Sequence, residues 1–455
     1  MIDLNIRHTL GNNWILREDP HHPNKRYSIY NIHTQMNYII KKPTYTLLNI
    51  FRLHALSVNE LMTHFVLKDI NFDWEGFWNV CNKIVPFDLL VESNEPFNTE
   101  DFHYKKCDMS GYDIPVASAP YGVELHFTHK CNLKCRHCFQ NSSPYSHKFK
   151  ELEAEQWVSI IKQFVRNKVH DVTISGGEPL CYSQFSTLFN EIVNEKIHYT
   201  ILTNATLVND YNIDALSKNN VTLSISLDGH SEKLHDDLRG KGVYQQVIKS
   251  IKRLINHKAR ISLSYTINAH NYLYMKEFVN FADSMGVRSV AFGFIENNGR
   301  AKQNANLILS LSQRQLAKSY FEQIKDKYNG KVNLNLIEVA SLNNNFSNSN
   351  KVYCSAGTTR IGVSADGKLY PCVYGFGNEE LIMGDLTKEY LEDIWENKEK
   401  WKMFRGSIQL EKINQCATCT LNNKCTLRNC RLRNYANYSL YNKPQECAID
   451  YSIHL

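Results

Sequence analysis

The chain has 455 residues, of which 43% are hydrophobic and 22% charged, and its formal net charge is +6. This length suggests about three domains of roughly 150 residues each, and the composition excludes a disordered or collagen-like chain. No stretch approaches the roughly 18 consecutive apolar residues of a membrane span, and the N-terminal MIDLNIRHTL lacks the apolar core of a secretory signal. Basic residues form no long run, so we expect a cytoplasmic protein that binds neither membrane nor nucleic acid.

The thirteen cysteines are the unusual feature of the composition. In a reducing compartment they should not form a disulfide framework. Ten of them fall into two spaced groups, which are Cys131, Cys135 and Cys138, and then Cys354, Cys372, Cys416, Cys419, Cys425, Cys430 and Cys447. Cys81, Cys107 and Cys181 lie outside both groups. Thiolates grouped in this way indicate metal binding.

The pattern of the first 95 residues predicts a small winged-helix module. The expected strands are 14–17, 27–32, 36–40 and a closing strand at 87–92, and the expected helices are 44–56, 57–67 and 74–84. Ser57 and Glu60 have the spacing of a capping box at the start of the second helix. Residues 96–120 are predicted to be a polar linker.

Between residues 121 and 340, short apolar runs alternate with amphipathic segments of helix length. The runs are Val123–Thr128, Val172–Ser175, Tyr199–Thr203, Val221–Leu227, Ile261–Ile267 and Val290–Ile295. Six strand-then-helix units in series predict an α/β fold, a partial (β/α)6 barrel of parallel strands with right-handed crossovers. In such a barrel the chemistry gathers in the loops after the strands. A polar linker at 341–350 should separate it from a metal-dependent C-terminal domain at 351–455.

The first cysteine group, Cys131, Cys135 and Cys138, follows the first predicted strand with the spacing C-x3-C-x2-C. Three thiolates on a [4Fe–4S] cluster leave one iron free to chelate a small molecule. The alternative is a structural zinc site, with His129 or His137 as its fourth ligand.

The loop after the second predicted strand contains Gly176, Gly177, Glu178 and Pro179. Two glycines allow a close approach of the backbone, and a carboxylate can accept hydrogen bonds from an ammonium group. A loop with three cysteines and a GGEP loop at the same end of one barrel form a far more specific pattern than either alone.

Together these two loops resemble those of the radical S-adenosylmethionine (SAM) enzymes. The resemblance implies that the three cysteines hold a [4Fe–4S] cluster, and that its free iron chelates the methionine part of SAM while GGEP holds the amino group. It also implies that one electron cleaves SAM and that the resulting 5′-deoxyadenosyl radical abstracts a substrate hydrogen. A flavodoxin- or ferredoxin-type protein is the implied electron donor.

Three further positions are similar to SAM-contacting positions of that family. Asn204 and Ser226 end the third and fourth predicted strands, and Arg239 resembles the arginine that pairs with the SAM carboxylate. Their alternatives are strand-end caps for Asn204 and Ser226, and a surface ion pair with Asp236 or Asp237 for Arg239. His126, just before the cluster loop, is expected to be a core or lining residue.

The second cysteine group is similar to the SPASM domain, which holds two auxiliary [4Fe–4S] clusters, so three clusters are implied in all. The resemblance assigns the outer cluster to Cys416, Cys419, Cys425 and Cys447, and the inner one to Cys354, Cys372 and Cys430. The last spacing is x4, one residue longer than the family's x3. Residues 355–371 contain no cysteine, so we expect an inner cluster with an open iron unless Cys107 or Cys181 completes it.

The winged-helix pattern resembles a RiPP recognition element, which binds the leader of a ribosomal precursor peptide as an added strand. DNA binding is the alternative, but the second and third predicted helices have only Lys68 and Lys83 as nearby cations.

The resulting hypothesis is a radical SAM peptide maturase that binds a precursor peptide and cross-links its core. Thioether formation is favoured, because an open iron could hold a substrate cysteine thiolate, although the auxiliary clusters could instead relay an electron. The alternatives are carbon–carbon or ether cross-linking, epimerisation, small-molecule modification, a sulfatase-maturing formylglycine enzyme and a non-catalytic iron–sulfur or zinc protein. Against the formylglycine alternative, Val373 stands where those enzymes place an aspartate base.

Overall fold

The computed structural model describes most of the chain. The described residues are 7–20, 22, 26–67, 89–95, 107–112, 114–328, 330–337, 351–352, 354–406, 408–409, 412–413, 417–419, 430, 432, 435 and 439–441. The predictions for helix 74–84, for the linker 341–350 and for Cys416, Cys425 and Cys447 lie outside these residues. Within the described residues, no helix is long and apolar enough to cross a membrane.

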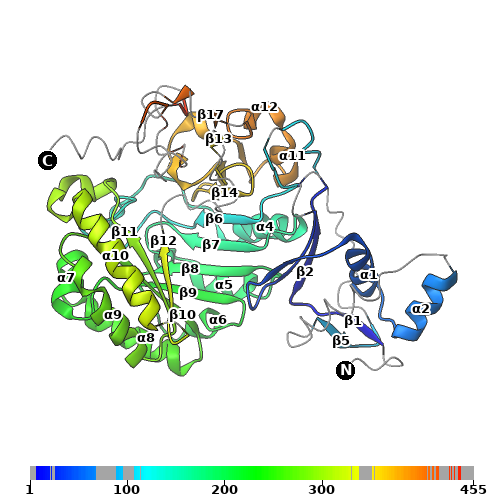
Figure 1. Ribbon diagram of the computed structural model, residues 1–455, viewed down its shortest axis with the longest axis horizontal. Helices are drawn as coiled ribbons and strands as arrows, with labels where there is room; N and C mark the ends of the chain where they lie inside the picture. The colour runs from blue at the N-terminus through cyan, green and yellow to red at the C-terminus, as the bar shows by residue number, and fades with distance from the viewer. Residues whose placement is uncertain are drawn as a thin grey trace.

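A ten-stranded sheet forms the centre of the molecule (Figure 1). Its parallel strands are β6 (Gly122–His126), β7 (Asp171–Ser175), β8 (His198–Thr203), β9 (Val221–Ser226), β10 (Arg260–Ile267), β11 (Ser289–Phe294) and β12 (Asn333–Ile337). The first six confirm the predicted strands, and they are adjacent in chain order, as consecutive right-handed β-then-α units require. The seventh, β12, was not predicted.

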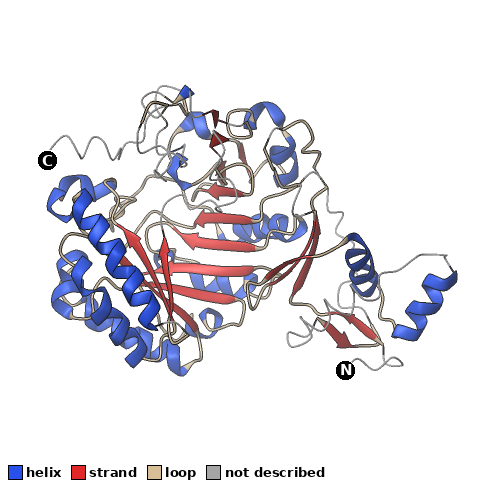
Figure 2. Cartoon of the chain, viewed as in Figure 1, coloured by secondary structure: helices blue, strands red, loops and turns tan. Residues whose placement is uncertain are grey.

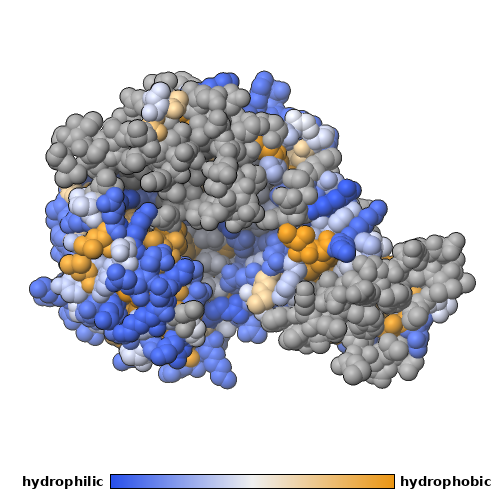
Figure 3. Space-filling view, in the orientation of Figure 1, coloured by the Kyte–Doolittle hydropathy of each residue, from blue (hydrophilic) through white to orange (hydrophobic). Residues whose placement is uncertain are grey.

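Helices cover the outer side of the sheet (Figure 2). They are α4 (Ala154–Arg166), α5 (Phe185–Ile192), α6 (Ile213–Leu216), α7 (Glu232–Arg239), α8 (Val243–Asn256), α9 (Met275–Ser284) and α10 (Leu311–Tyr328). The helix α4 shows why they form: Glu153 and Gln156 make a capping box at its start, and Trp157, Ile161 and Phe164 lie on one face and are fully buried. The outward face of this layer is mainly hydrophilic (Figure 3).

The C-terminal segment continues the central sheet. β14 (Arg360–Val363) pairs in parallel with β6, and β15 (Lys368–Tyr370) and β16 (Gly384–Asp385) follow it as antiparallel strands. The remaining described elements are the helices α11 (Leu391–Glu396) and α12 (Lys398–Trp401) and the strand pair β13 (Lys351–Val352) and β17 (Ile408–Gln409). Cys372, which follows β15, lies against Gly362 of β14, where an added Cβ would lie 3.0 Å from its carbonyl carbon.

The N-terminal module contains most of its predicted elements. They are β2 (Trp14–Glu18), β3 (Tyr27–Asn31), β4 (Asn37–Ile39), α1 (Lys42–Leu53), α2 (Val58–Leu67) and β5 (Leu90–Glu92). Ser57 and Glu60 exchange the two hydrogen bonds of the predicted capping box, with N–O distances of 2.8 and 3.1 Å. The strand β1 (His8–Leu10), which pairs with β5, was not predicted.

This module is attached to the amino ends of the barrel strands. Buried Arg17 and Asp19 form an ion pair at 2.9 Å, and Arg17 also donates to the carbonyl oxygens of Ala119 and Pro120. The ring of Tyr30 stacks on His170, which directly precedes β7, at 4.6 Å between centroids. Because the cysteine loop follows the carboxyl end of β6, the module and that loop lie at opposite ends of the barrel.

The structure departs from the polar linker expected at 96–120. In its described second half, Cys107, Met109, Ile114 and Val116 are buried in the main core. The carbonyl of Ala117 accepts a hydrogen bond from the indole of Trp395 at 2.9 Å. These apolar residues remove more surface from water by packing under α11 than a solvated linker would.

Candidate functional site

The loop with Cys131, Cys135 and Cys138 is held in place by main-chain hydrogen bonds. The Arg300 amide donates to the Cys138 carbonyl at 3.0 Å, and the Arg300 guanidinium donates to the Cys135 carbonyl at 2.7 Å. Gly299 makes this approach possible, because a Cβ there would lie 2.2 Å from the Cys138 oxygen. Three thiol side chains are thereby presented from one short, fixed loop.

The GGEP loop packs directly against the cysteine loop. The Gly177 amide donates to the Thr128 carbonyl at 3.0 Å, and the Glu178 amide donates to the Lys130 carbonyl at 2.8 Å. A Cβ at Gly177 would lie 2.0 Å from the Lys130 oxygen, so only glycine fits. The structure therefore brings the two sequence motifs together, as the parallel sheet requires.

The Glu178 side chain connects GGEP to the end of β8. Its carboxylate is buried and accepts hydrogen bonds from the Thr203 hydroxyl at 2.6 Å and the Asn204 amide at 2.7 Å. Burial raises the pKa of Glu178 to about 6 despite these hydrogen bonds. The Asn204 side chain donates in turn to Asn132 in the cysteine loop at 3.0 Å, and it lies 3.9 Å from the Cys131 sulfur. Glu178 and Asn204 thus position three adjacent loops.

Arg239 lies at the cysteine loop, where its Nη1 is 3.9 Å from the Cys135 sulfur. It pairs with buried Asp228 at 2.6 Å, so the alternative of a surface ion pair with Asp236 or Asp237 is wrong. Those two carboxylates are occupied elsewhere, because Asp236 accepts from the amides of the α7–α8 turn and Asp237 pairs with Arg136.

Asp228 is a site residue that the sequence analysis did not single out. Burial alone would raise its pKa, but the Arg239 guanidinium outweighs burial and holds the pKa of this carboxyl well below its usual range. Burial lowers the pKa of His137 to about 4, so its neutral ring accepts a hydrogen bond from Arg239 at 3.4 Å. The signal available in the sequence was the position of Asp228 just beyond the end of β9. Ser226, the last residue of β9, lies two residues before Asp228.

The resemblance implies that Arg239 pairs with the SAM carboxylate. We therefore expect Asp228→Asn to weaken SAM binding about tenfold, because the charge-assisted hydrogen bond that orients Arg239 is lost. Equilibrium dialysis of the reconstituted protein measures this affinity, and iron content should not change. Asp237→Asn, at the exposed partner of Arg136, serves as the matched control and should leave the affinity as it is. Equal SAM affinity for Asp228→Asn and the control would contradict the positioning role.

The proposed inner ligands Cys354, Cys372 and Cys430 lie near one another. Burial first, and then the nearby Cys354 and Cys430, raise the pKa of Cys372 well above its ordinary value. The two proposed extra ligands are occupied elsewhere: the Cys181 thiol lies 3.8 Å from Asn132, and the Cys107 thiol donates to the Glu392 carbonyl at 3.5 Å. Of the proposed outer ligands, only Cys419 is among the described residues, and it is partly buried.

An acidic contact connects the two cysteine groups. Tyr374, two residues after Cys372, donates its hydroxyl to the Glu296 carboxylate at 2.8 Å, and its ring packs edge-on against Phe139 at 5.1 Å. Phe139 directly follows Cys138. The sequence analysis named no base, because Glu296 and Tyr374 are far apart in the chain and carry no local motif.

The donor chemistry fits iron–sulfur binding. Buried Cys135, which the Arg239 guanidinium flanks, can be deprotonated by iron and kept as a thiolate. Among the described residues, no three His, Cys, Asp or Glu side chains converge closely enough to hold a single metal ion. A cubane distributes its thiolates over separate irons and does not need that convergence. His126 is fully buried beside Phe376, which confirms it as a core residue.

Comparison with known families agrees with this geometry. The radical SAM superfamily model matches residues 125–285, and the SPASM model, an iron–sulfur cluster-binding domain, matches residues 354–420.

Several curated proteins are similar to parts of the chain. The antilisterial bacteriocin subtilosin biosynthesis protein AlbA of Bacillus subtilis is 23% identical over 63% of this chain and 62% of its own length. The sporulation killing factor maturation protein SkfB of the same organism is 26% identical over 60% of this chain and 64% of its own. The chain therefore spans less than two thirds of the length of these two relatives. The mycofactocin maturase MftC of Mycobacterium ulcerans is 23% identical over 68% of this chain and 82% of its own length.

Solved structures show the same fold over nearly the whole chain. Streptococcus suis SuiB bound to its precursor peptide SuiA superposes with a TM-score of 0.72 at 17% identity, covering 96% of this chain and 99% of that one. The enzyme anSMEcpe with bound AdoMet and a peptide superposes with a TM-score of 0.54 at 16% identity. The match covers 73% of this chain and 96% of that one.

Proposed function

Because the chain is a radical SAM enzyme with a SPASM domain, we propose that it binds a ribosomal precursor peptide and cross-links its core through a cysteine thioether. The observation that carries this proposal is the meeting of three parts at one end of the sheet. They are the cysteine loop, the GGEP loop and the Tyr374–Glu296 contact, which extends this end to Cys372.

The proposed site residues have two roles: some bind the cluster or SAM, and others orient the residues that do. When bound, the cluster supplies the electron that cleaves SAM, and the radical so formed takes a hydrogen from the substrate. Arg239, oriented by Asp228, would pair with the SAM carboxylate, and Asn204 and Ser226 would line the same pocket. The proposed ligands of the SAM cluster are Cys131, Cys135 and Cys138. The amino group of SAM would be held by the GGEP loop, Gly176, Gly177, Glu178 and Pro179. Auxiliary clusters would be held by Cys354, Cys372 and Cys430, and by Cys416, Cys419, Cys425 and Cys447.

Thioether formation is favoured only if the inner auxiliary cluster has three protein ligands and therefore an open iron. Cys354, Cys372 and Cys430 provide three thiolates, and the contacts of Cys107 and Cys181 lie elsewhere. A substrate cysteine is the thiolate that would complete a cubane with three protein ligands.

Peptide binding is supported by the edge strand β4 and by the comparisons. No described strand pairs with the outer edge of β4. Met36, just before β4, and Ile39, its last residue, expose 44% and 59% of their surface. An exposed edge with apolar side chains suits a leader peptide that binds as an added strand. The names of AlbA and SkfB describe bacteriocin biosynthesis and killing-factor maturation, and SuiB is seen with a precursor peptide.

Anaerobic turnover with SAM, dithionite and a precursor peptide, to be sought as a short reading frame beside the gene, tests the proposal. Each thioether removes two hydrogens. The one on carbon leaves as an atom in 5′-deoxyadenosine, and the one on sulfur leaves as a proton, while the remaining electron would pass to an auxiliary cluster. Tandem mass spectrometry locates the bond. A carbon–carbon or ether bond between other residues contradicts the thioether version. An unchanged mass with altered chirality indicates epimerisation, and an unchanged peptide overturns the proposed function.

A further inference from the structure

The strand β6 carries a carboxylate, Glu124, that has no role in the function proposed above. Alternate residues of a strand point the same way, so Glu124 and His126 share one face of the sheet, and Thr173 of β7 lies opposite Glu124 on that face. Val123 and Leu125 are fully buried, as expected for the face that the helices cover, whereas Glu124 and Thr173 are partly exposed. Glu124 therefore points to the inside of the barrel.

A glycine in β14 allows the segment after β15 to approach Glu124. Gly362 is the partner of Glu124 in the parallel register, and an added Cβ there would lie 3.0 Å from the carbonyl carbon of Cys372 and 2.8 Å from the ring of Phe376. The ring of Phe376 also packs edge-on against His126, at 4.7 Å between centroids. Opposite residues of a sheet point to the same face, so Cys372 and Phe376 cover the face from which Glu124 projects.

Glu124 is also close enough to Cys372 for its charge to act on that thiol. Burial has the largest effect on the pKa of Cys372, followed by Cys354 and Cys430, and the Glu124 carboxylate raises this pKa further. Three thiols and one carboxylate therefore lie in one neighbourhood.

The Glu124 carboxylate is not used by the rest of the fold. In the described part of the chain it accepts no hydrogen bond, and its one charged contact is the Nε2 atom of His126 at 3.7 Å. Neither ring nitrogen of His126 has a hydrogen-bond partner there. Only 32% of the Glu124 side chain is exposed. A carboxylate largely removed from water without donors is unfavourable unless a further group binds it.

The inner auxiliary cluster is the group that lacks a ligand at this place. Its three proposed thiolates leave one iron open, and Cys107 and Cys181 have their contacts elsewhere. Iron accepts carboxylate oxygen as well as thiolate and imidazole ligands. His126 is less suited, because it is fully buried between Phe376 and Gly176.

We propose that the Glu124 carboxylate is the fourth ligand of the inner auxiliary cluster when no substrate is bound. This inference rests on the proposed function, which supplies the cluster. A substrate cysteine then exchanges with Glu124 and does not enter an empty position. One iron–oxygen bond is replaced by one iron–sulfur bond, the thiol proton leaves to Glu296, and no electron moves. Thiolate is the softer ligand and is favoured over carboxylate on the cluster iron.

Binding of carbon-13-labelled cyanide to the dithionite-reduced protein tests this ligand without turnover. The background variant Cys131→Ala, Cys135→Ala and Cys138→Ala removes the other open iron and should keep about eight irons. Electron–nuclear double resonance detects cyanide on iron. If Glu124 occupies the iron for about nine tenths of the time, Glu124→Gln should bind cyanide about tenfold more tightly than the background, because the competing carboxylate is gone.

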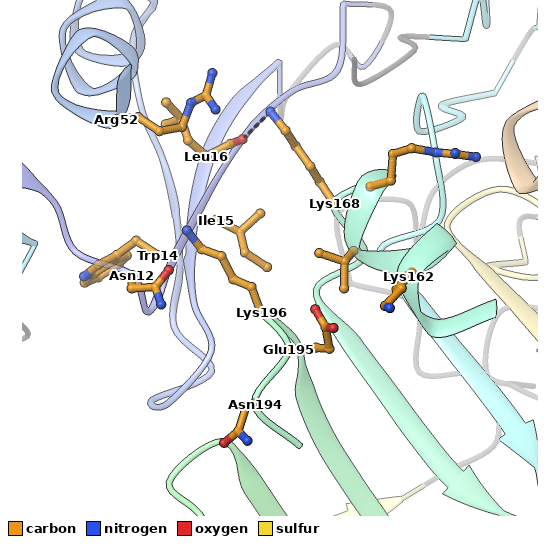
Figure 4. A pocket seen from close by; sticks show the side chains of 12 residues that line it. Asn12, Trp14, Ile15, Leu16, Arg52, Lys162, Lys168, Asn194, Glu195 and Lys196 are labelled. Atoms are coloured by element: carbon orange, nitrogen blue, oxygen red, sulfur yellow. Dashed lines mark hydrogen bonds between the residues drawn. The ribbon is translucent and has the colours of Figure 1, made fainter. Parts of the chain in front are cut away.

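Two further variants in the same background control this measurement. Glu195→Gln is the matched control, because the Glu195 carboxylate lies just before β8, in the cavity of about 520 Å³ between the N-terminal module and the amino ends of the strands (Figure 4). It should leave the cyanide affinity unchanged. Glu124→Cys places a thiolate at the same position, so it should keep about eight irons and bind no cyanide.

Equal cyanide affinity in Glu124→Gln and Glu195→Gln would overturn the proposal, and so would cyanide binding by Glu124→Cys. A loss of about four irons in Glu124→Gln that Glu124→Cys restores would support it, whereas a loss shared by both variants would reject Glu124 as a ligand. If the background itself holds four irons or fewer, the inner cluster is missing and the proposed function fails. About eight irons with equal cyanide affinities reject the role of Glu124 alone.

Discussion

The triple variant Cys131→Ala, Cys135→Ala and Cys138→Ala is expected to release no detectable 5′-deoxyadenosine from SAM under dithionite. All three cysteines lie on one loop that Arg300 and the GGEP loop hold in place, so their removal takes away every thiolate offered there. Chromatography with mass detection measures the nucleoside. About four of about twelve irons should be lost, because the auxiliary cysteines are unchanged.

Cys181→Ala is the matched control for this experiment. Its thiol lies in the same neighbourhood, 3.8 Å from Asn132, but outside the C-x3-C-x2-C motif. The control should keep both the iron and the nucleoside release. Release that persists in the triple variant would contradict the assignment of the cluster, and an unaltered protein with four irons or fewer and stoichiometric zinc would favour the structural zinc alternative.

The barrel strands could be predicted because each is a local apolar run between helix-length segments. The run Val221–Leu227 agrees with β9 to within one residue, and its alternate residues are buried. The position of GGEP next to the cysteine loop was likewise predictable, because the carboxyl ends of adjacent parallel strands meet at one edge.

The features that the sequence did not predict depend on pairing between residues that are far apart in the chain. The strand β14 has only four residues, and it joins the sheet by pairing with β6, more than two hundred residues earlier in the chain. In the same way, Arg239 has Asp236 and Asp237 as sequence neighbours, yet it pairs with Asp228 because α7 folds back over the end of β9.

Glu296→Gln is expected to lower cross-linked product formation by a hundredfold or more while deoxyadenosine release continues, since a positioned base contributes on the order of 10²–10⁴ in rate. The reason is the proton balance of the proposed reaction. When the carbon–sulfur bond forms, the thiol proton must leave the substrate, and the Glu296 carboxylate lies where the two cysteine groups meet, 2.8 Å from the Tyr374 hydroxyl. Gln keeps the size of the side chain and its contact with Tyr374 but accepts no proton at neutral pH.

The control for this variant is Tyr374→Phe, which removes the hydrogen bond to Glu296 and keeps both the carboxylate and the ring packing on Phe139. Because only the orientation of the carboxylate is affected, its product formation should fall by about tenfold or less. Iron content and deoxyadenosine release separate a chemical effect from misfolding in both variants. Product formation by Glu296→Gln at or above the level of Tyr374→Phe would show that the proton leaves by another route. The carboxylate would then be a structural link between the barrel and the segment that carries Cys372.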